Sequence, residues 1–214
     1  MPLPVPAAAR LRGRLHQVCA VAAVPAAVSV ARLGRSPAAR RAGAAYGAGL
    51  VTVFSVSAAY HRGRWSPSAR RAMKRLDHAA IFAFAATSYG PLGLVLPRGP
   101  RRVLRTTAWT AAAVGSAVKA VELDVDGGLA DALYLVTGWA GLLVLPALLR
   151  SLTPAERSLL LGGGAVYTAG AAVLVRRRPD PAPAVFGYHE LGHTVMLGGT
   201  VLHYLLHRSV LRAG

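Results

Sequence analysis

The sequence is poor in acidic residues and contains a single cysteine. Of its 214 residues, 8 are Asp or Glu and 25 are Lys or Arg, and charged residues make up 15% of the total. Because an average soluble domain carries about 25% charged residues, this composition excludes an ordinary soluble enzyme and a disordered chain. A lone cysteine, Cys19, excludes an internal disulfide and a cysteine-rich metal site.

What the chain has in abundance is apolar sequence, since 54% of its residues are hydrophobic. The apolar residues form runs close to the length of about 20 residues that a helix needs to cross a bilayer. We therefore predict an all-α integral membrane protein, a single domain folded as a seven-transmembrane helix bundle. Its approximate spans are residues 15–31, 42–60, 79–96, 103–121, 129–149, 158–175 and 184–206.

The first span is the weakest of the seven. It is rich in alanine, contains Pro25 and follows Arg10, Arg12 and Arg14 in the manner of a signal peptide. We expect it to be retained as a span. The following run contains Gly43 and Gly47 at the spacing that lets two membrane helices approach closely.

The formal charge of +17 comes from basic clusters that lie between the apolar runs. Loops facing an anionic lipid surface have this pattern, so we expect membrane lipids as partners and no nucleic acid. Basic residues divide almost evenly between the two sides of a seven-span topology. The densest clusters, residues 70–75 and 176–178, share one side with the N-terminus, and we take that side of the plasma membrane as cytoplasmic.

Five polar residues fall near membrane depth at the ends of three predicted spans. Ser57 and His61 end the second span, Asp77 precedes the third, and His189 and His193 begin the seventh. The loops that join these spans lie on the same side of the membrane, so all five residues are expected at similar depth. Ionisable residues at such positions are costly and usually functional.

The spacing of these residues predicts a zinc site. His189 and His193 are four residues apart, as are Ser57 and His61, and each pair therefore shares a helix face. Three neutral imidazoles and one open position form a catalytic type of zinc site. Asp77 and Ser57 would then hold a water on the metal as acceptor and donor.

Each of these residues also has a simpler interpretation. The histidines could flank the spans at the interface, Asp77 could cap the third span, and Ser57 could bond to a neighbouring helix. Interfacial positions are our expectation for the other four histidines, which are His16, His78, His203 and His207.

Residues 189–193 also match the zinc-protease pattern H-E-x-x-H, with Glu190 as the general base. In an apolar helix, this pattern would indicate an intramembrane metalloprotease. Such an enzyme needs a further carboxylate ligand, and the interpretation leaves His61 without a role.

Taken together, these motifs resemble those of the hemolysin III-like branch of the progestin and adiponectin receptor superfamily, whose members have seven spans. The matching segments occur in family order across nearly the whole chain: SAAYH at 57–61, LDHAAI at 76–81, TSYGP at 87–91, YLxxGW at 134–139, FGYHELGH at 186–193 and LH at 202–203.

The resemblance implies a cytoplasmic N-terminus and a zinc ion held by His61, His189 and His193, with Ser57 and Asp77 near the water. Two residues depart from the family pattern. Gly192 stands where a bulky residue is common, which would open space near the metal, and Gly90 replaces a frequent hydroxyl residue.

These observations leave several functions open. The first is a zinc-dependent hydrolase of a lipid amide or ester, resembling ceramide-cleaving relatives, in which Asp77 moves the proton and Ser57 orients the reactants. The second is a membrane sensor or lipid homeostasis factor with structural zinc. The hemolysin label implies a third, direct pore formation, but no amphipathic switch segment is apparent. The substrate and the oligomeric state stay open.

Overall fold

The computed structural model describes residues 9–121 and 129–214, and within these ranges the chain is helical apart from short connections. This confirms the predicted all-α class. The elements are α1 (Arg14–Leu33), α2 (Pro37–Arg62), α3 (Pro67–Val95), α4 (Arg98–Val121), α5 (Leu129–Gly138), the 3-10 helix η1 (Ala140–Val144), α6 (Leu145–Ser151), α7 (Pro154–Arg176) and α8 (Tyr188–Ala213).

In the described part of the chain, four helices are long and apolar enough to cross a membrane, namely α1, α2, α3 and α7. A shorter apolar stretch, Val136–Ser151, runs from the last residues of α5 to the end of α6. The helices α4 and α8 have 24 and 26 residues, but their apolar residues are mixed with arginines and histidines. The chain is thus an integral membrane protein by composition and helix length.

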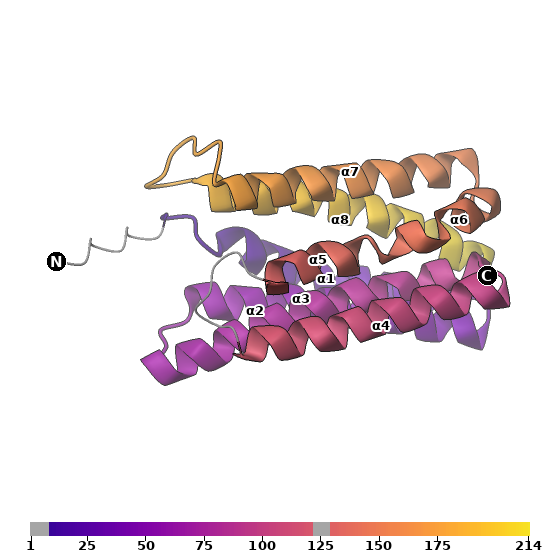
Figure 1. Ribbon diagram of the computed structural model, residues 1–214, viewed down its shortest axis with the longest axis horizontal. Helices are drawn as coiled ribbons and strands as arrows, with labels where there is room; N and C mark the ends of the chain where they lie inside the picture. The colour runs from indigo at the N-terminus through magenta and orange to yellow at the C-terminus, as the bar shows by residue number, and fades with distance from the viewer. Residues whose placement is uncertain (1–8, 122–128) are drawn as a thin grey trace.

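The helices form an elongated bundle in which neighbours in sequence lie beside each other (Figure 1). The closest pairs are α1 with α2, α2 with α3, α3 with α4, and α7 with α8. The last helix, α8, also contacts α1, α2 and α3, so it joins the α7 side of the bundle to the other helices. Its residues Leu206 and Val210 belong to a core cluster shared with α3, α4 and α6.

The fifth predicted span is not one helix. The structure breaks it after Gly138 with a 3-10 segment and restarts it as α6, whose first turn contains Pro146. A proline cannot donate a backbone hydrogen bond to the preceding turn. The hydroxyl of Tyr89 donates to the carbonyl oxygens of Thr137 (3.1 Å) and Gly138 (2.5 Å), which lie where α5 ends and so lack helical donors.

Two helices do not coincide in extent with their approximate predicted spans. The third helix begins at Pro67 rather than at residue 79, because Ser66 caps it by accepting a hydrogen bond from Ala69 N at 3.3 Å. Asp77 therefore lies within α3 and is not its N-cap. The last helix begins at Tyr188 rather than at 184 and continues to Ala213.

Glycines set the close approach of two helix pairs. As the Gly43 and Gly47 spacing predicted, α1 packs directly on these residues, where an added Cβ at Gly47 would lie 2.9 Å from the Ala27 Cα. In α7, a Cβ at Gly170 would lie 2.9 Å from the Gly192 oxygen and 3.0 Å from the Met196 nitrogen of α8. Small residues that let backbones meet are the usual basis of membrane helix packing.

We predict that Gly170→Ala destabilises the protein by about 1–3 kcal/mol, because the new methyl group meets the backbone of α8, which cannot move aside alone. Gly164→Ala is the matched control, since nothing lies within 4 Å of its added Cβ, and removing a helix glycine there should stabilise by about 0.5–1 kcal/mol. Thermal unfolding in detergent micelles measures both variants. Equal stabilities would contradict the packing described.

Candidate metal centre

Four imidazole rings from three helices meet at one end of the bundle. His16 comes from α1, His61 from α2, and His189 and His193 from α8. Neighbouring ring centroids lie 5.4 Å apart for His16 and His61, 5.2 Å for His61 and His189, 4.4 Å for His189 and His193, and 4.8 Å for His193 and His16. The four rings therefore form a closed circuit, which we call the histidine cluster.

The segment before α1 is hydrogen-bonded to the residues that precede α8, and these bonds fix where His16 enters the bundle. The backbone nitrogens of Arg10 and Leu11 donate to the carbonyl oxygens of Ala184 and Val185 at 3.0 and 3.1 Å. At Gly13 the backbone has φ of 78°, a left-handed conformation that favours glycine. An added Cβ there would lie 2.7 Å from the Cβ of His61.

His61 occupies the last turn of α2, where the chain ends the helix locally. The Gly63 nitrogen and the Trp65 indole nitrogen both donate to the carbonyl oxygen of Ala59, at 2.8 and 3.0 Å. These two bonds satisfy a helix-end carbonyl that otherwise has no partner. They keep the final turn in place and hold His61 at the end of the bundle where α8 begins.

The first turn of α8 positions the other two histidines and is capped by its own carboxylate. Glu190 Oε2 accepts from the Gly187 nitrogen at 3.0 Å, and Asp180 Oδ1 accepts from the Tyr188 nitrogen at 2.7 Å. Glu190 is buried, with 5% of its surface exposed. Both bonds satisfy backbone donors that a helix start leaves open.

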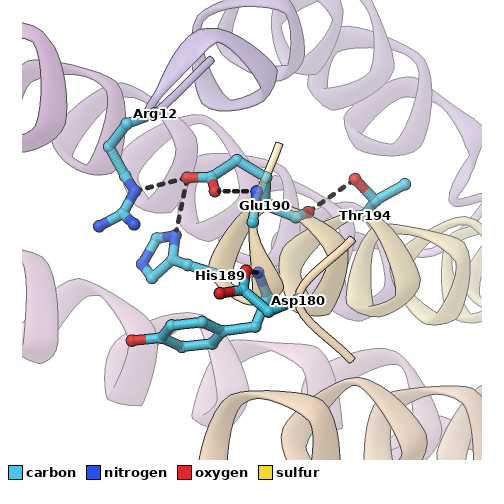
Figure 2. A network of polar contacts seen from close by, with 7 residues as sticks. Arg12, Asp180, His189, Glu190 and Thr194 are labelled. Atoms are coloured by element: carbon cyan, nitrogen blue, oxygen red, sulfur yellow. Dashed lines mark hydrogen bonds and ion pairs between the residues drawn. The ribbon is translucent and has the colours of Figure 1, made fainter. Parts of the chain in front are cut away.

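The second oxygen of Glu190 lies between an arginine and a histidine (Figure 2). Arg12 Nε donates to Glu190 Oε1 at 2.5 Å, and His189 Nδ1 lies 3.5 Å from the same oxygen. A carboxylate beside one ring nitrogen of a histidine fixes the ring and leaves the other nitrogen to bind elsewhere. Glu190 thus orients His189 and anchors the N-terminal segment.

Ser57 and Asp77 form a second polar pair, between α2 and α3. Both are buried, and the Ser57 hydroxyl donates a hydrogen bond to the Asp77 carboxylate. Asp77 Oδ1 has no hydrogen-bond partner within the described residues. Ser57 precedes His61 by four residues, so Ser57 lies about 6 Å along α2 from His61.

The structure therefore brings together the sequence-predicted residues in two groups: His61 with His189 and His193, and Ser57 with Asp77. Sequence reasoning missed His16, which is 6% exposed and belongs to the histidine cluster. The signal was available, because the same counting of spans puts the N-terminus on the side of the other three histidines.

The remaining predicted interfacial histidines are not free at a surface either. His78 Nδ1 shares a 2.6 Å hydrogen bond with the Tyr134 hydroxyl. His203 lies beside the Leu160 carbonyl, and His207 is 1% exposed and packs edge-on against the ring of Tyr46, 4.5 Å between centroids. Both residues face inward because α8 is central to the bundle.

Gly192 does not open space near the cluster, as its departure from the family pattern suggested. An added Cβ would lie 2.6 Å from Leu174 Cδ2 and 3.2 Å from the Gly170 oxygen. The helix α7 fills the space that a larger side chain would take. This glycine therefore serves the close packing of α7 and α8.

The donor set suits zinc, but it is not preformed. Among residues 9–121 and 129–214, no three His, Cys, Asp or Glu side chains are arranged to hold a metal ion as they stand. Two imidazoles sharing a tetrahedral zinc would have their centroids about 5 Å apart, because the Zn–N distance is about 2 Å. The spacings of the histidine cluster, 4.4–5.4 Å, surround that value.

Comparison with known proteins places these residues in a family. The family model described as haemolysin-III related matches residues 8–204. Hemolysin-3 of Bacillus cereus is 28% identical over 162 residues, which cover 75% of this chain and 74% of that protein. A Hemolysin-3 homolog of Bacillus subtilis (strain 168) is 29% identical over 126 residues, or 58% and 56% of the two chains. The matched region contains every residue of the histidine cluster, and the chain belongs to the haemolysin-III-related family.

Proposed function

We propose that this protein is a zinc-dependent hydrolase that cleaves an amide or ester bond of a membrane lipid. The observation that carries the proposal is the meeting of imidazoles from α1, α2 and α8 at the bundle end that also contains the Ser57–Asp77 pair. Buried ionisable residues inside a membrane protein are expensive, and a shared catalytic site accounts for their presence.

The chemistry of the donors supports zinc as the cofactor. His61, His189 and His193 would hold it, since neutral imidazole is a common zinc ligand. Rotation of the rings about their side-chain torsions would direct nitrogens at a shared ion, since the second torsion of histidine has a broad range. When bound, zinc supplies Lewis acidity that polarises a carbonyl group and makes water acidic enough to attack near neutral pH.

Asp77 and Ser57 would carry out the proton transfer and the orientation. Asp77 Oδ1 would take a proton from the attacking water and return it to the leaving nitrogen or oxygen. Ser57, beside the Asp77 carboxylate, would hold the carboxylate in place and leave Oδ1 available to the reactants. The substrate would be a long-chain lipid that enters sideways from the bilayer, because the site lies at the end of apolar helices.

The contacts of Glu190 weigh against the protease interpretation of H-E-x-x-H. One oxygen accepts from the Gly187 nitrogen and the other is paired with Arg12. A general base needs a carboxylate oxygen directed at water near the reacting bond. Glu190 instead caps α8 and orients His189, which leaves Asp77 as the base.

The topology that we propose has seven spans with a cytoplasmic N-terminus. The spans would be α1, α2, α3, α4, the broken segment from α5 to α6, α7 and α8. The histidine cluster would then lie near the cytoplasmic surface of the plasma membrane, together with the basic residues 70–75 and 176–178.

We predict that the purified protein contains about one zinc ion per chain and that His61→Ala and His189→Ala lose it. Plasma mass spectrometry of metal content measures this directly. His78→Ala is the control, because its ring is bonded to Tyr134 on another side of α3. Equal zinc in all three variants, or none in the unmodified protein, would end the zinc proposal.

Asp77→Asn should keep zinc and fold but lower lipid turnover by about 10²–10⁴-fold, since it removes the proton acceptor. Lipidomics of cells producing each variant identifies the lipid whose level changes, and vesicles of that lipid then give the rate. Glu190→Gln is the matched carboxylate-to-amide comparison and should cost about 10–100-fold, less than Asp77→Asn, because glutamine also completes a capping box but orients His189 less firmly.

A larger loss of activity in Glu190→Gln than in Asp77→Asn would support the protease interpretation. If Asp77→Asn changes little while His61→Ala lowers the unfolding temperature, the zinc is structural and the protein is a sensor or lipid homeostasis factor.

The topology predicts opposite labelling of two loops in intact cells. In a Cys19→Ala background, Arg35→Cys lies between α1 and α2 and should react with a membrane-impermeant thiol reagent. Arg64→Cys lies between α2 and α3, is equally exposed, and should react only after the cells are opened. Labelling of Arg64→Cys alone in intact cells would invert the proposed orientation.

A further inference from the structure

We propose that His16 is a fourth metal ligand, so that the resting site is held by four imidazoles from three helices. This inference rests on the proposed function, because it assumes that the histidine cluster binds zinc. It adds a ligand from α1 to the three histidines of α2 and α8 that the proposed function uses.

The arrangement of the rings is the first argument. His16 lies between His61 and His193, at centroid distances of 5.4 and 4.8 Å, which match the spacing of the other neighbouring pairs. Without His16 the circuit is open on the α1 side. With it, each ring has an imidazole neighbour on two sides, and each neighbouring pair has about the spacing that two ligands of one tetrahedral zinc would have.

The burial of His16 is the second argument. The residue is 6% exposed, and its Nδ1 has no hydrogen-bond partner within the described residues. A buried polar atom without a partner costs about 1–3 kcal/mol, and such atoms usually have a functional reason. An imidazole nitrogen beside three other imidazoles is suited to bind a cation that they share.

The local fold is the third argument, because several contacts restrain the backbone just before His16 and so fix the position of its ring. Gly13, three residues before His16, takes a left-handed conformation against His61. Arg12, four residues before His16, is paired with Glu190. The backbone bonds of Arg10 and Leu11 to residues 184 and 185 fix the same segment to the start of α8. The first turn of α1 is therefore tied to both helices that carry the other ligands.

A four-histidine site is closed, since zinc in proteins is usually four-coordinate. Access of a lipid carbonyl to the metal would then require His16 to leave or the coordination number to rise to five. His16 would act as an exchangeable ligand that keeps water and cations out until substrate arrives. A site with three histidines has an open position at all times.

The experiment counts nitrogen ligands and measures affinity in the full-length protein in detergent micelles. X-ray absorption at the zinc edge should find four imidazoles in the unmodified protein and three in His16→Ala, with an oxygen in the fourth position. The cobalt(II) derivative should lose four-nitrogen absorption in the variant, and the zinc Kd should rise at least about tenfold. Free imidazole added to His16→Ala should restore the original spectrum by filling the vacated position.

Two further variants separate coordination from stability. His207→Ala removes an imidazole that is buried even more deeply, at 1% exposure, and whose nitrogens also have no partner within the described residues. This variant should leave the metal spectrum unchanged. His16→Gln keeps a polar side chain of similar size and should show the same three imidazoles if His16→Ala does not fold.

The outcomes distinguish this inference from the proposed function. Zinc bound by three imidazoles in both the unmodified protein and the His16 variants overturns the role of His16 and leaves the hydrolase proposal standing. No binding of zinc or cobalt(II) by the unmodified protein overturns both.

Discussion

Polar groups inside a membrane bundle must find their partners within the protein, because the bilayer core offers no water for hydrogen bonds. This constraint explains most of the contacts that shape the present structure. Where α5 ends at Gly138, the Tyr89 hydroxyl donates to backbone carbonyls that have lost their helical donors. Where α8 begins, Glu190 satisfies the Gly187 nitrogen and a guanidinium group at once. In the histidine cluster, several rings share this requirement.

The helix α8 is where packing and chemistry meet. One set of its residues is small, and Gly192 and Gly199 let α7 lie directly on its backbone. Another set is polar and faces the other helices, so the same element brings His189 and His193 to α1 and α2 and buries His207 against Tyr46. A helix that is apolar on all faces could fill the same volume, but it would bring no imidazoles to α1 and α2.

The N-terminal segment gives a clear example of a local conformation serving a distant group. Residues 9–13 are tied to residues 184, 185 and 190 by backbone bonds and an ion pair. The turn at Gly13 then directs α1 inward beside His61. These contacts link sequence positions about 170 residues apart, and they place the first histidine of the chain beside the fifth in the same cluster.

The sequence by itself determined the helical class, the membrane character, the family, and the association of His61 with His189 and His193, because apolar run length and residue spacing are local properties. It did not determine where helices begin, since Ser66 and Glu190 act through caps that depend on their neighbours in space. Nor did it show that His16 lies between His61 and His193 or that α7 packs against Gly192. Only the tertiary structure decided these points, because they depend on which helix faces meet and on how closely two backbones approach.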